Sequence, residues 1–141
     1  MTTPPAAYDD FASYDTGWMD LPYATTSGVA NFADYAAGTG PQGRRIGHLV
    51  ELVGQVKPAN AATVTAMGTG AGAIVLVLPA DLLPATAIAR AYVSQGSSSA
   101  RWACNINPAT GEVFANRFAG TTLGTSTWLP FSFTYFAKDP A

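Results

Sequence analysis

Apolar and polar residues alternate along residues 44–57, whose sequence is RRIGHLVELVGQVK. A period of two is typical of a β-strand with one face toward a core and the other toward solvent. We therefore predict one long, half-buried strand here. Its more apolar face contains Ile46, His48, Val50, Leu52 and Val56, and its other face contains Arg45, Leu49, Glu51, Val53, Gln55 and Lys57.

The rest of the chain repeats this pattern of short apolar segments separated by Gly, Pro, Asn or Ser. Residues 73–78 form a continuous apolar run, which indicates a strand covered on both faces. Further strands are predicted at residues 17–21, 63–67, 87–94, 101–106, 112–118 and 127–137. The last has Leu129, Phe131, Phe133 and Tyr135 on one face and Ser132 and Thr134 on the other. Residues 25–43 are predicted to be a loop, and no helix is expected. About eight short strands with turns between them indicate an antiparallel β-sandwich or barrel.

The first 17 residues differ from the rest because they show no periodicity. Pro4 and Pro5 favour an extended path over a helix, and aromatic side chains recur every three residues among acidic ones. Such a segment is suited to docking into a groove of another protein, although a disordered terminus explains the composition equally well. We therefore divide the chain into an extended arm, residues 1–17, and one domain, residues 18–141. The arm residues expected to make the attachment are Tyr8, Asp9, Asp10, Phe11 and Tyr14.

Charged residues make up 11% of the chain, against about 25% in an average soluble protein. The seven Lys and Arg residues are scattered, whereas nucleic-acid binding needs them clustered. The longest apolar run, residues 73–80, is too short to cross a bilayer, and the N-terminus lacks the features of a signal peptide. Cys104 is the single cysteine, so we expect a small buried hydrophobic side chain rather than a disulfide. The composition argues against nucleic-acid binding and membrane insertion.

Residues suited to catalysis are scarce. His48, the one histidine, falls on the apolar face of the predicted strand, where a core or interface role is commoner than catalysis. Glu51, Asp81 and Glu112 fall on separate elements, so the sequence does not indicate the paired carboxylates of a glycosidase. We therefore expect no enzymatic activity, no metal and no cofactor.

Sugar binding is the one ligand hypothesis with physical support. Exposed aromatic rings can stack on sugar rings, while Asn, Asp and Ser side chains bind hydroxyl groups. Burial in the core is the alternative for each ring. The candidates are Tyr35, Tyr92, Trp102 and Trp128, of which Trp102 and Tyr92 are taken as the glycan contacts.

Five short motifs follow one another along residues 17–136. They are Gly17-Trp18, RRIGHLVELVG at 44–54, LPADLLP at 78–84, NPATGEV at 107–113 and STWL at 126–129. In this order they resemble the motifs of bacteriophage virion domains with a jelly-roll fold, found in tail fibres, minor tail proteins and head fibres. The chain departs from that family at Asp81, where many members have Gly, and in the Ala- and Gly-rich residues 61–73, which are longer than the family's loop.

The resemblance implies a parallel homotrimer around a threefold axis, with the N-terminal arm fastened to the virion. The expected role is non-enzymatic: a structural protein on the exterior of the particle, at the tail tip or a tail fibre, with an end that contacts the host surface. A capsid decoration protein or head fibre is the alternative, and a carbohydrate-active enzyme or lectin-like module that works free of any particle is a third. The expected partners are other copies of the chain, further phage tail or capsid proteins, and a host cell-surface glycan. The residues expected in the core or along the trimer seam are Ile46, His48, Val50 and Leu52.

Overall fold

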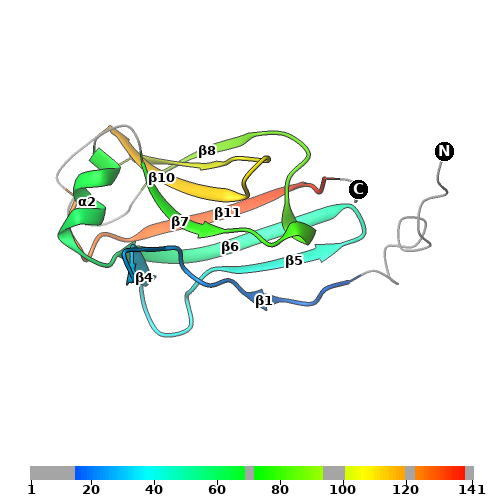
Figure 1. Cartoon of the computed structure of the whole chain (residues 1–141), viewed down its shortest axis with the longest axis horizontal. Coiled ribbons are helices and arrows are strands. Elements are labelled where there is room, and N and C mark those ends of the chain that lie inside the picture. Colours follow the sequence, from blue (N-terminus) through cyan, green and yellow to red (C-terminus); the bar gives the residue numbers. More distant parts are fainter. Residues whose placement is uncertain (1–14, 69–71, 94–100, 120–122, 139–141) are drawn as a thin grey trace.

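The computed structural model describes residues 15–68, 72–93, 101–119 and 123–138, without the side chains of residues 90–93 and 117–119. Two antiparallel sheets face each other and enclose one hydrophobic core (Figure 1). The predicted all-β class with antiparallel sheets is therefore confirmed. No helix among these residues is long and apolar enough to span a membrane.

The first sheet is built around a central pair of long strands. Its strand order is β1-β5-β6-β11, and the short strand β4 pairs with the far end of β6. The bounds are β1 (Met19–Asp20), β4 (Phe32–Asp34), β5 (Gln42–Ile46), β6 (Leu49–Pro58) and β11 (Leu129–Phe136). The β6–β11 pair stays in register over eight residues, from Leu129 opposite Val56 to Phe136 opposite Leu49.

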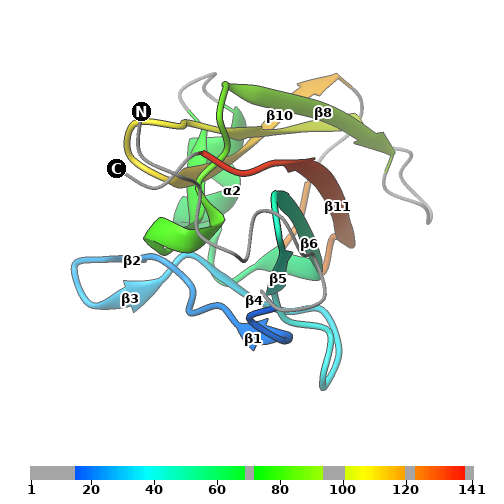
Figure 2. The same ribbon diagram turned by 90° about the vertical axis from the view of Figure 1, so that its right-hand side faces the viewer.

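The second sheet has the order β7-β10-β9-β8. Its strands are β7 (Ala73–Val77), β8 (Ile88–Val93), β9 (Arg101–Ile106) and β10 (Glu112–Ala119). The consecutive strands β8, β9 and β10 lie side by side, and β10, the last of them, pairs with β7, which precedes them in the chain. This is a Greek-key order. The 3-10 helix η2 (Ala80–Leu82) lies between β7 and β8 in sequence, and a small hairpin of β2 (Thr25–Thr26) and β3 (Val29–Ala30) projects to one side (Figure 2).

The core lies between the two sheets. Leu52 of β6 and Phe133 of β11 face it from the first sheet, and Trp102 and Ile106 of β9 face it from the second, all at 1% exposure or less. As predicted, Leu129, Phe131, Phe133 and Tyr135 are buried, whereas Ser132 and Thr134 are exposed. Cys104 is also fully buried, and burial raises the pKa of its thiol, as the sequence suggested for a small hydrophobic side chain.

Residues 44–57 form a hairpin, so the prediction of one long strand is wrong. β5 ends at Ile46 and β6 begins at Leu49, with Gly47 and His48 as the two-residue turn. Gly47 has φ +57°, a conformation that suits glycine at the first position of a tight hairpin turn. The turn changes which residues face inward: Arg45 is buried and Ile46 points to the outer side of the sheet, whereas Val50 and Leu52 face the core as predicted.

A helix was not expected at residues 63–67, which were predicted to be a strand, but α2 (Ala61–Gly68) is present. Asn60 caps its first turn, because its Oδ1 accepts hydrogen bonds from the backbone N–H of Thr63 at 3.0 Å and from the Thr63 hydroxyl at 3.2 Å. An Asn N-cap before an alanine pair is a recognised helix start. Thr63 and Met67, four residues apart, are the buried side chains of this helix.

Two other predictions are corrected in part. Residues 25–43, predicted as a loop, contain β2, β3 and β4. The strand at residues 73–78 is not covered along its whole length, because Val77 is half exposed. Val75 and Leu76 are nevertheless both fully buried, since an irregularity in the β7–β10 register places them beside each other on the inner side.

Residues 15–17 run along β5 and tie the start of the described chain to the first sheet. Asp15 forms a backbone bridge with Ile46, and the Thr16 N–H donates to the Arg45 carbonyl at 3.0 Å. The Asp15 carboxylate also accepts two hydrogen bonds from the Arg44 side chain. The predicted attachment residues Tyr8, Asp9, Asp10, Phe11 and Tyr14 lie outside the described residues.

This tether should weaken at low pH. The pKa of Asp15 is lowered to about 2, because the Arg44 side chain and the Gly17 N–H donate to the carboxylate. The contribution of Asp15 to stability is therefore fully present above about pH 4 and is lost as the pH falls toward about 2. NMR titration of the Asp15 carboxyl should show this low pKa, and Arg44→Met should raise it toward its ordinary value. An Asp15 pKa that does not change in Arg44→Met would contradict the ion pair.

Candidate functional site

The outer face of the first sheet carries apolar, charged and polar side chains that are accessible to solvent. We define it by the side chains of β5, β6 and β11 that point away from the core. They are Gln42, Arg44 and Ile46; Leu49, Glu51, Val53, Gln55 and Lys57; and Pro130, Ser132, Thr134 and Phe136. Strand register aligns these residues in rows across the three strands, because directly opposite residues in an antiparallel pair share a face.

At the hairpin end of this face, three apolar residues lie in one row. Ile46 is opposite Leu49, and Leu49 is opposite Phe136. Phe136 is 69% exposed and Leu49 37%, so the row places a large aromatic side chain and an aliphatic one in water. We call these three residues the apolar row. The arm reaches the domain at the same place, since Asp15 pairs with Ile46.

The next row contains the charges. Arg44 is opposite Glu51, which is opposite Thr134, and Arg44 is ion-paired with Asp15. In the next two rows the outer side chains are uncharged: first Gln42, Val53 and Ser132, and then Gln55 and Pro130. The outer face is therefore apolar at the hairpin end, charged in the next row and uncharged in the following two rows, which we call its neutral end. Lys57 lies beyond these two rows on β6.

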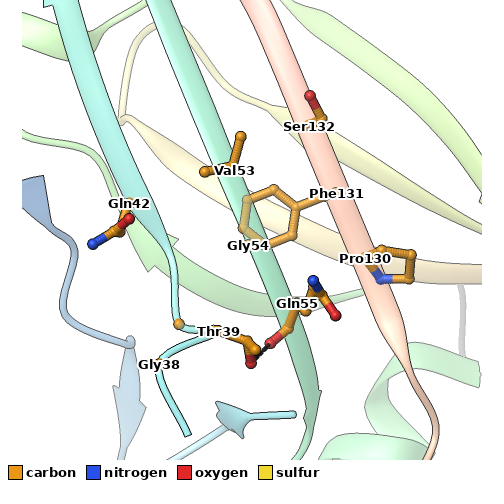
Figure 3. A pocket seen from close by; sticks show the side chains of 10 residues that line it. Gly38, Thr39, Gln42, Val53, Gly54, Gln55, Pro130, Phe131 and Ser132 are labelled. Carbon is orange, nitrogen blue, oxygen red and sulfur yellow. Dashed lines mark hydrogen bonds between the residues drawn. The ribbon is translucent and has the colours of Figure 1, made fainter. Parts of the chain in front are cut away.

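A groove of about 420 Å³ occupies the neutral end (Figure 3). It exists because β5 pairs with residues Leu49–Val53 of β6 and β4 pairs with Val56–Pro58, which leaves a gap in pairing beside Gln55. The loop at residues 35–41 fills this gap and forms one wall. The groove is lined by Gly38, Thr39, Gly40, Gln42, Val53, Gly54, Gln55, Pro130, Phe131 and Ser132.

Two aromatic side chains meet beside the groove. The rings of Tyr35 and Trp128 lie 6.3 Å apart between centroids and are tilted by 50°. The Trp128 indole N–H donates to the Gln55 Oε1 at 2.9 Å, and the Tyr35 N–H donates to the Gln55 carbonyl at 3.0 Å. Gln55, which lines the groove, therefore holds both aromatic residues at its edge.

The residues predicted for the trimer or core face lie in different environments in the structure. Val50 and Leu52 are fully buried in the core of the single chain, whereas Ile46 lies in the apolar row. His48 is in the hairpin turn, partly buried, and its carbonyl accepts the Ala137 N–H at 2.7 Å. Its expected position on the apolar face of a strand is wrong, because the chain reverses at this residue.

The predicted glycan contacts need correction. Trp102 has 0% exposure, so its ring is unavailable to a sugar at the surface of this fold. It alternates inward with Cys104 and Ile106 along β9, and all three side chains belong to the hydrophobic core. The Tyr92 side chain lies outside the described part of the structure. The other two aromatic candidates, Tyr35 and Trp128, are the ones brought together.

The remaining chemistry is sparse among the described residues. They contain no group of three or more His, Cys, Asp or Glu side chains arranged for a metal ion. Glu51 lies on the outer face of β6, Asp81 in η2 and Glu112 at the start of β10, on three different elements. A second cavity of about 730 Å³ lies between the β2–β3 hairpin and α2. Its Asn31 and Asn60 side chains bind backbone carbonyls, and Asn60 also caps α2.

Sequence reasoning identified Tyr35 and Trp128 individually but could not pair them. It also missed Gln55, which appeared only as a polar residue on a strand. Gln55 and Trp128 are 73 residues apart in sequence, and the β6–β11 register that joins them leaves no local pattern. No protein-family model, no curated protein and no solved structure matches this chain.

Proposed function

We propose that this chain is a non-enzymatic structural protein of a bacteriophage virion. In this proposal it is a jelly-roll domain that forms a homotrimer and is fastened by its N-terminal arm to the tail tip or a tail fibre, on the exterior of the particle. The observation that carries the proposal is the apolar row beside the point where the arm joins the domain. Assembly of chains through this end would bury Phe136 and Leu49 and direct the arms toward a common attachment point.

The geometry of the apolar row supports an interface between chains. Burial of water-exposed apolar area stabilises an interface by about 25 cal/mol per Å². Aromatic side chains are also enriched at interface centres. The adjacent row carries one basic and one acidic residue, Arg44 and Glu51, so copies of this face can approach without strong repulsion between like charges. The 11% charge content of the chain is in keeping with a surface that is partly covered by other chains.

The positions of the sequence motifs support the jelly-roll component of the proposal. The LPADLLP motif follows β7 directly and forms the turn through η2, where the Leu82 N–H donates to the Pro79 carbonyl at 3.0 Å. The NPATGEV motif forms the β9–β10 hairpin, closed by the Asn107 N–H bonded to the Glu112 carbonyl at 3.0 Å. A jelly roll combines two Greek keys, and the second sheet has the strand order of one.

The alternative location is the capsid, where the protein would act as a decoration protein or head fibre. To distinguish the two, the fluorescently labelled chain and a version lacking residues 1–14 can be mixed with particles of the virus that encodes it. We expect the complete chain to label tails and the shortened chain to label nothing. Labelling of heads would replace the tail assignment with the capsid one. If the complete chain binds no part of the particle, the virion proposal is wrong.

A further inference from the structure

We propose that the groove at the neutral end of the outer face is a binding site for a neutral saccharide. Tyr35 and Trp128 are the stacking residues, and Gln42 and Gln55 are the partners of sugar hydroxyl groups. The proposal assigns a ligand class to the host-surface contact suggested above, and to that extent it rests on the proposed function.

The groove has the size and construction of a ligand site. Its volume of about 420 Å³ falls within the range of roughly 300–1,000 Å³ that is usual for small-molecule sites. Its loop wall is fixed to β6 before any ligand arrives. The Gln55 N–H donates to the Thr39 carbonyl at 2.8 Å, the Thr39 hydroxyl donates to the Gln55 carbonyl at 2.9 Å, and the Ala36 N–H donates to the Thr39 hydroxyl at 3.0 Å. A preformed wall lowers the entropy lost on binding.

The charge of the lining points to a neutral ligand. None of the residues that line the groove is ionisable. Lys57 follows Gln55 on the outer side of β6, and the carboxylates of Asp20 and Asp34 lie beside Gln42 and Gly40, so these charged groups border the groove without lining it. A phosphate or carboxylate ligand would lose hydration here without gaining an ionic partner among the lining residues. Hydroxyl groups, in contrast, lose little when amides and hydroxyls replace water around them.

The aromatic pair supplies a surface for the apolar faces of sugar rings. Tyr35 is 41% exposed, and the 50° tilt between the two rings means that they are not stacked on each other. Trp128 is half-buried and fixed in orientation by its hydrogen bond to Gln55. Aromatic side chains combine a large apolar area with few rotatable bonds, so they bind rigid, amphipathic ligands at a low cost in entropy.

The two glutamines offer complementary hydrogen-bonding groups. The Gln55 Oε1 accepts the Trp128 indole N–H, which leaves the Gln55 amide N–H groups as donors for a hydroxyl oxygen. The Gln42 Nε2 donates to Asp20 Oδ1 at 2.8 Å, which leaves the Gln42 Oε1 as an acceptor for a hydroxyl proton. A sugar hydroxyl can both donate and accept, so a donor and an acceptor in one groove suit a polyhydroxylated ligand.

The test applies the full-length chain to an array of neutral and acidic glycans, and then titrates the strongest binder by NMR. We expect a neutral oligosaccharide to bind with millimolar or better affinity and to shift the signals of Gly38, Gly40, Gln55 and the Trp128 indole. Tyr35→Ala should weaken binding about tenfold or more, in keeping with a stacking contribution of roughly 1–3 kcal/mol for a flat ligand on an aromatic ring. Tyr35→Phe, which keeps the ring, should bind as the unmodified chain does.

Trp18→Ala is the matched control, because Trp18 is an exposed aromatic residue directly before β1 and is not part of the Tyr35–Trp128 pair. It should leave the affinity unchanged. Gln55→Leu gives a second test through the polar contacts and should also weaken binding. The proposal is overturned if no neutral glycan binds, if binding survives Tyr35→Ala and Gln55→Leu, or if acidic glycans bind better. It is also overturned if a proline-rich peptide, the other ligand for aromatic-lined grooves, shifts the same signals and the glycans do not. The mass of the chain, measured in the same sample, reports on trimer formation separately from sugar binding. The saccharide proposal and the virion proposal can therefore each fail alone.

Discussion

Trp102→Ala is expected to lower the free energy of unfolding by about 3–5 kcal/mol, the usual cost of removing a large aromatic side chain from a core. Trp102 is the largest of the fully buried side chains. It enters the core from β9, the strand that pairs with both β8 and β10, so the cavity would lie at the centre of the second sheet. Close packing around it limits how far neighbouring residues can relax to fill that space.

Urea unfolding followed by far-UV circular dichroism measures this effect. Trp18→Ala is the control for loss of an indole, and we expect a change within about 0.5 kcal/mol because Trp18 is 46% exposed. The outcome that would contradict the structure is a Trp102→Ala variant as stable as the control. That result would place the Trp102 ring at the surface and restore it as a candidate glycan contact.

Arg45→Ala is expected to cost about 2–4 kcal/mol, because it removes charged donors from buried carbonyl acceptors. Arg45 is 4% exposed. Its Nε donates to the Gly47 carbonyl at 2.8 Å, and its guanidinium reaches across to the Asp81 carbonyl at 3.1 Å. These bonds hold the β5–β6 turn in shape and join it to η2, so their loss should affect both segments.

Arg44→Ala provides a control of the same residue type at the next position in sequence. Arg44 points to the outer face and its ion pair with Asp15 is exposed to solvent, so we expect the midpoint of unfolding to change little. Arg45→Met, which keeps most of the apolar stem, should recover packing but not the hydrogen bonds, and should fall between Arg45→Ala and the unmodified chain. Equal effects of Arg44→Ala and Arg45→Ala would show that Arg45 is not buried as described.

The alternation of apolar and polar residues correctly predicted strands that have one face in the core and the other in solvent. β11 is the clearest case, since its four inward residues and its polar neighbours follow the sequence pattern. The same reasoning failed at residues 44–57, because an apolar pattern continues through Gly47 and His48 even though the chain turns there. The hairpin signal was the glycine itself, followed by a residue that tolerates a tight turn. Arg45 could not be placed inward, because its acceptors are carbonyls of a turn and of η2.

The helix and the groove were missed for different reasons. The β-branched residues 63–65 have a low helix propensity, so α2 was not predicted. The Asn60 cap and the alanines at 61–62 were nevertheless local signals for it. The groove has no local signal, since its walls come from the loop at 35–41, β6 and β11. Aromatic content alone could not separate Trp102, which is in the core, from Tyr35 and Trp128, which are at the surface. That separation depends on pairing between strands distant in sequence.

The measurement that tests the central claim most directly is the mass of the full-length chain at micromolar concentration, by light scattering coupled to size exclusion. The account predicts three times the mass of one chain, and a shift to the single-chain mass in Phe136→Asp, which places a charge in the apolar row. Val77→Asp, at an exposed apolar residue of the second sheet, should leave the trimer intact. A single-chain mass for the unmodified protein, or a trimer that persists in Phe136→Asp, would contradict assembly through the apolar row.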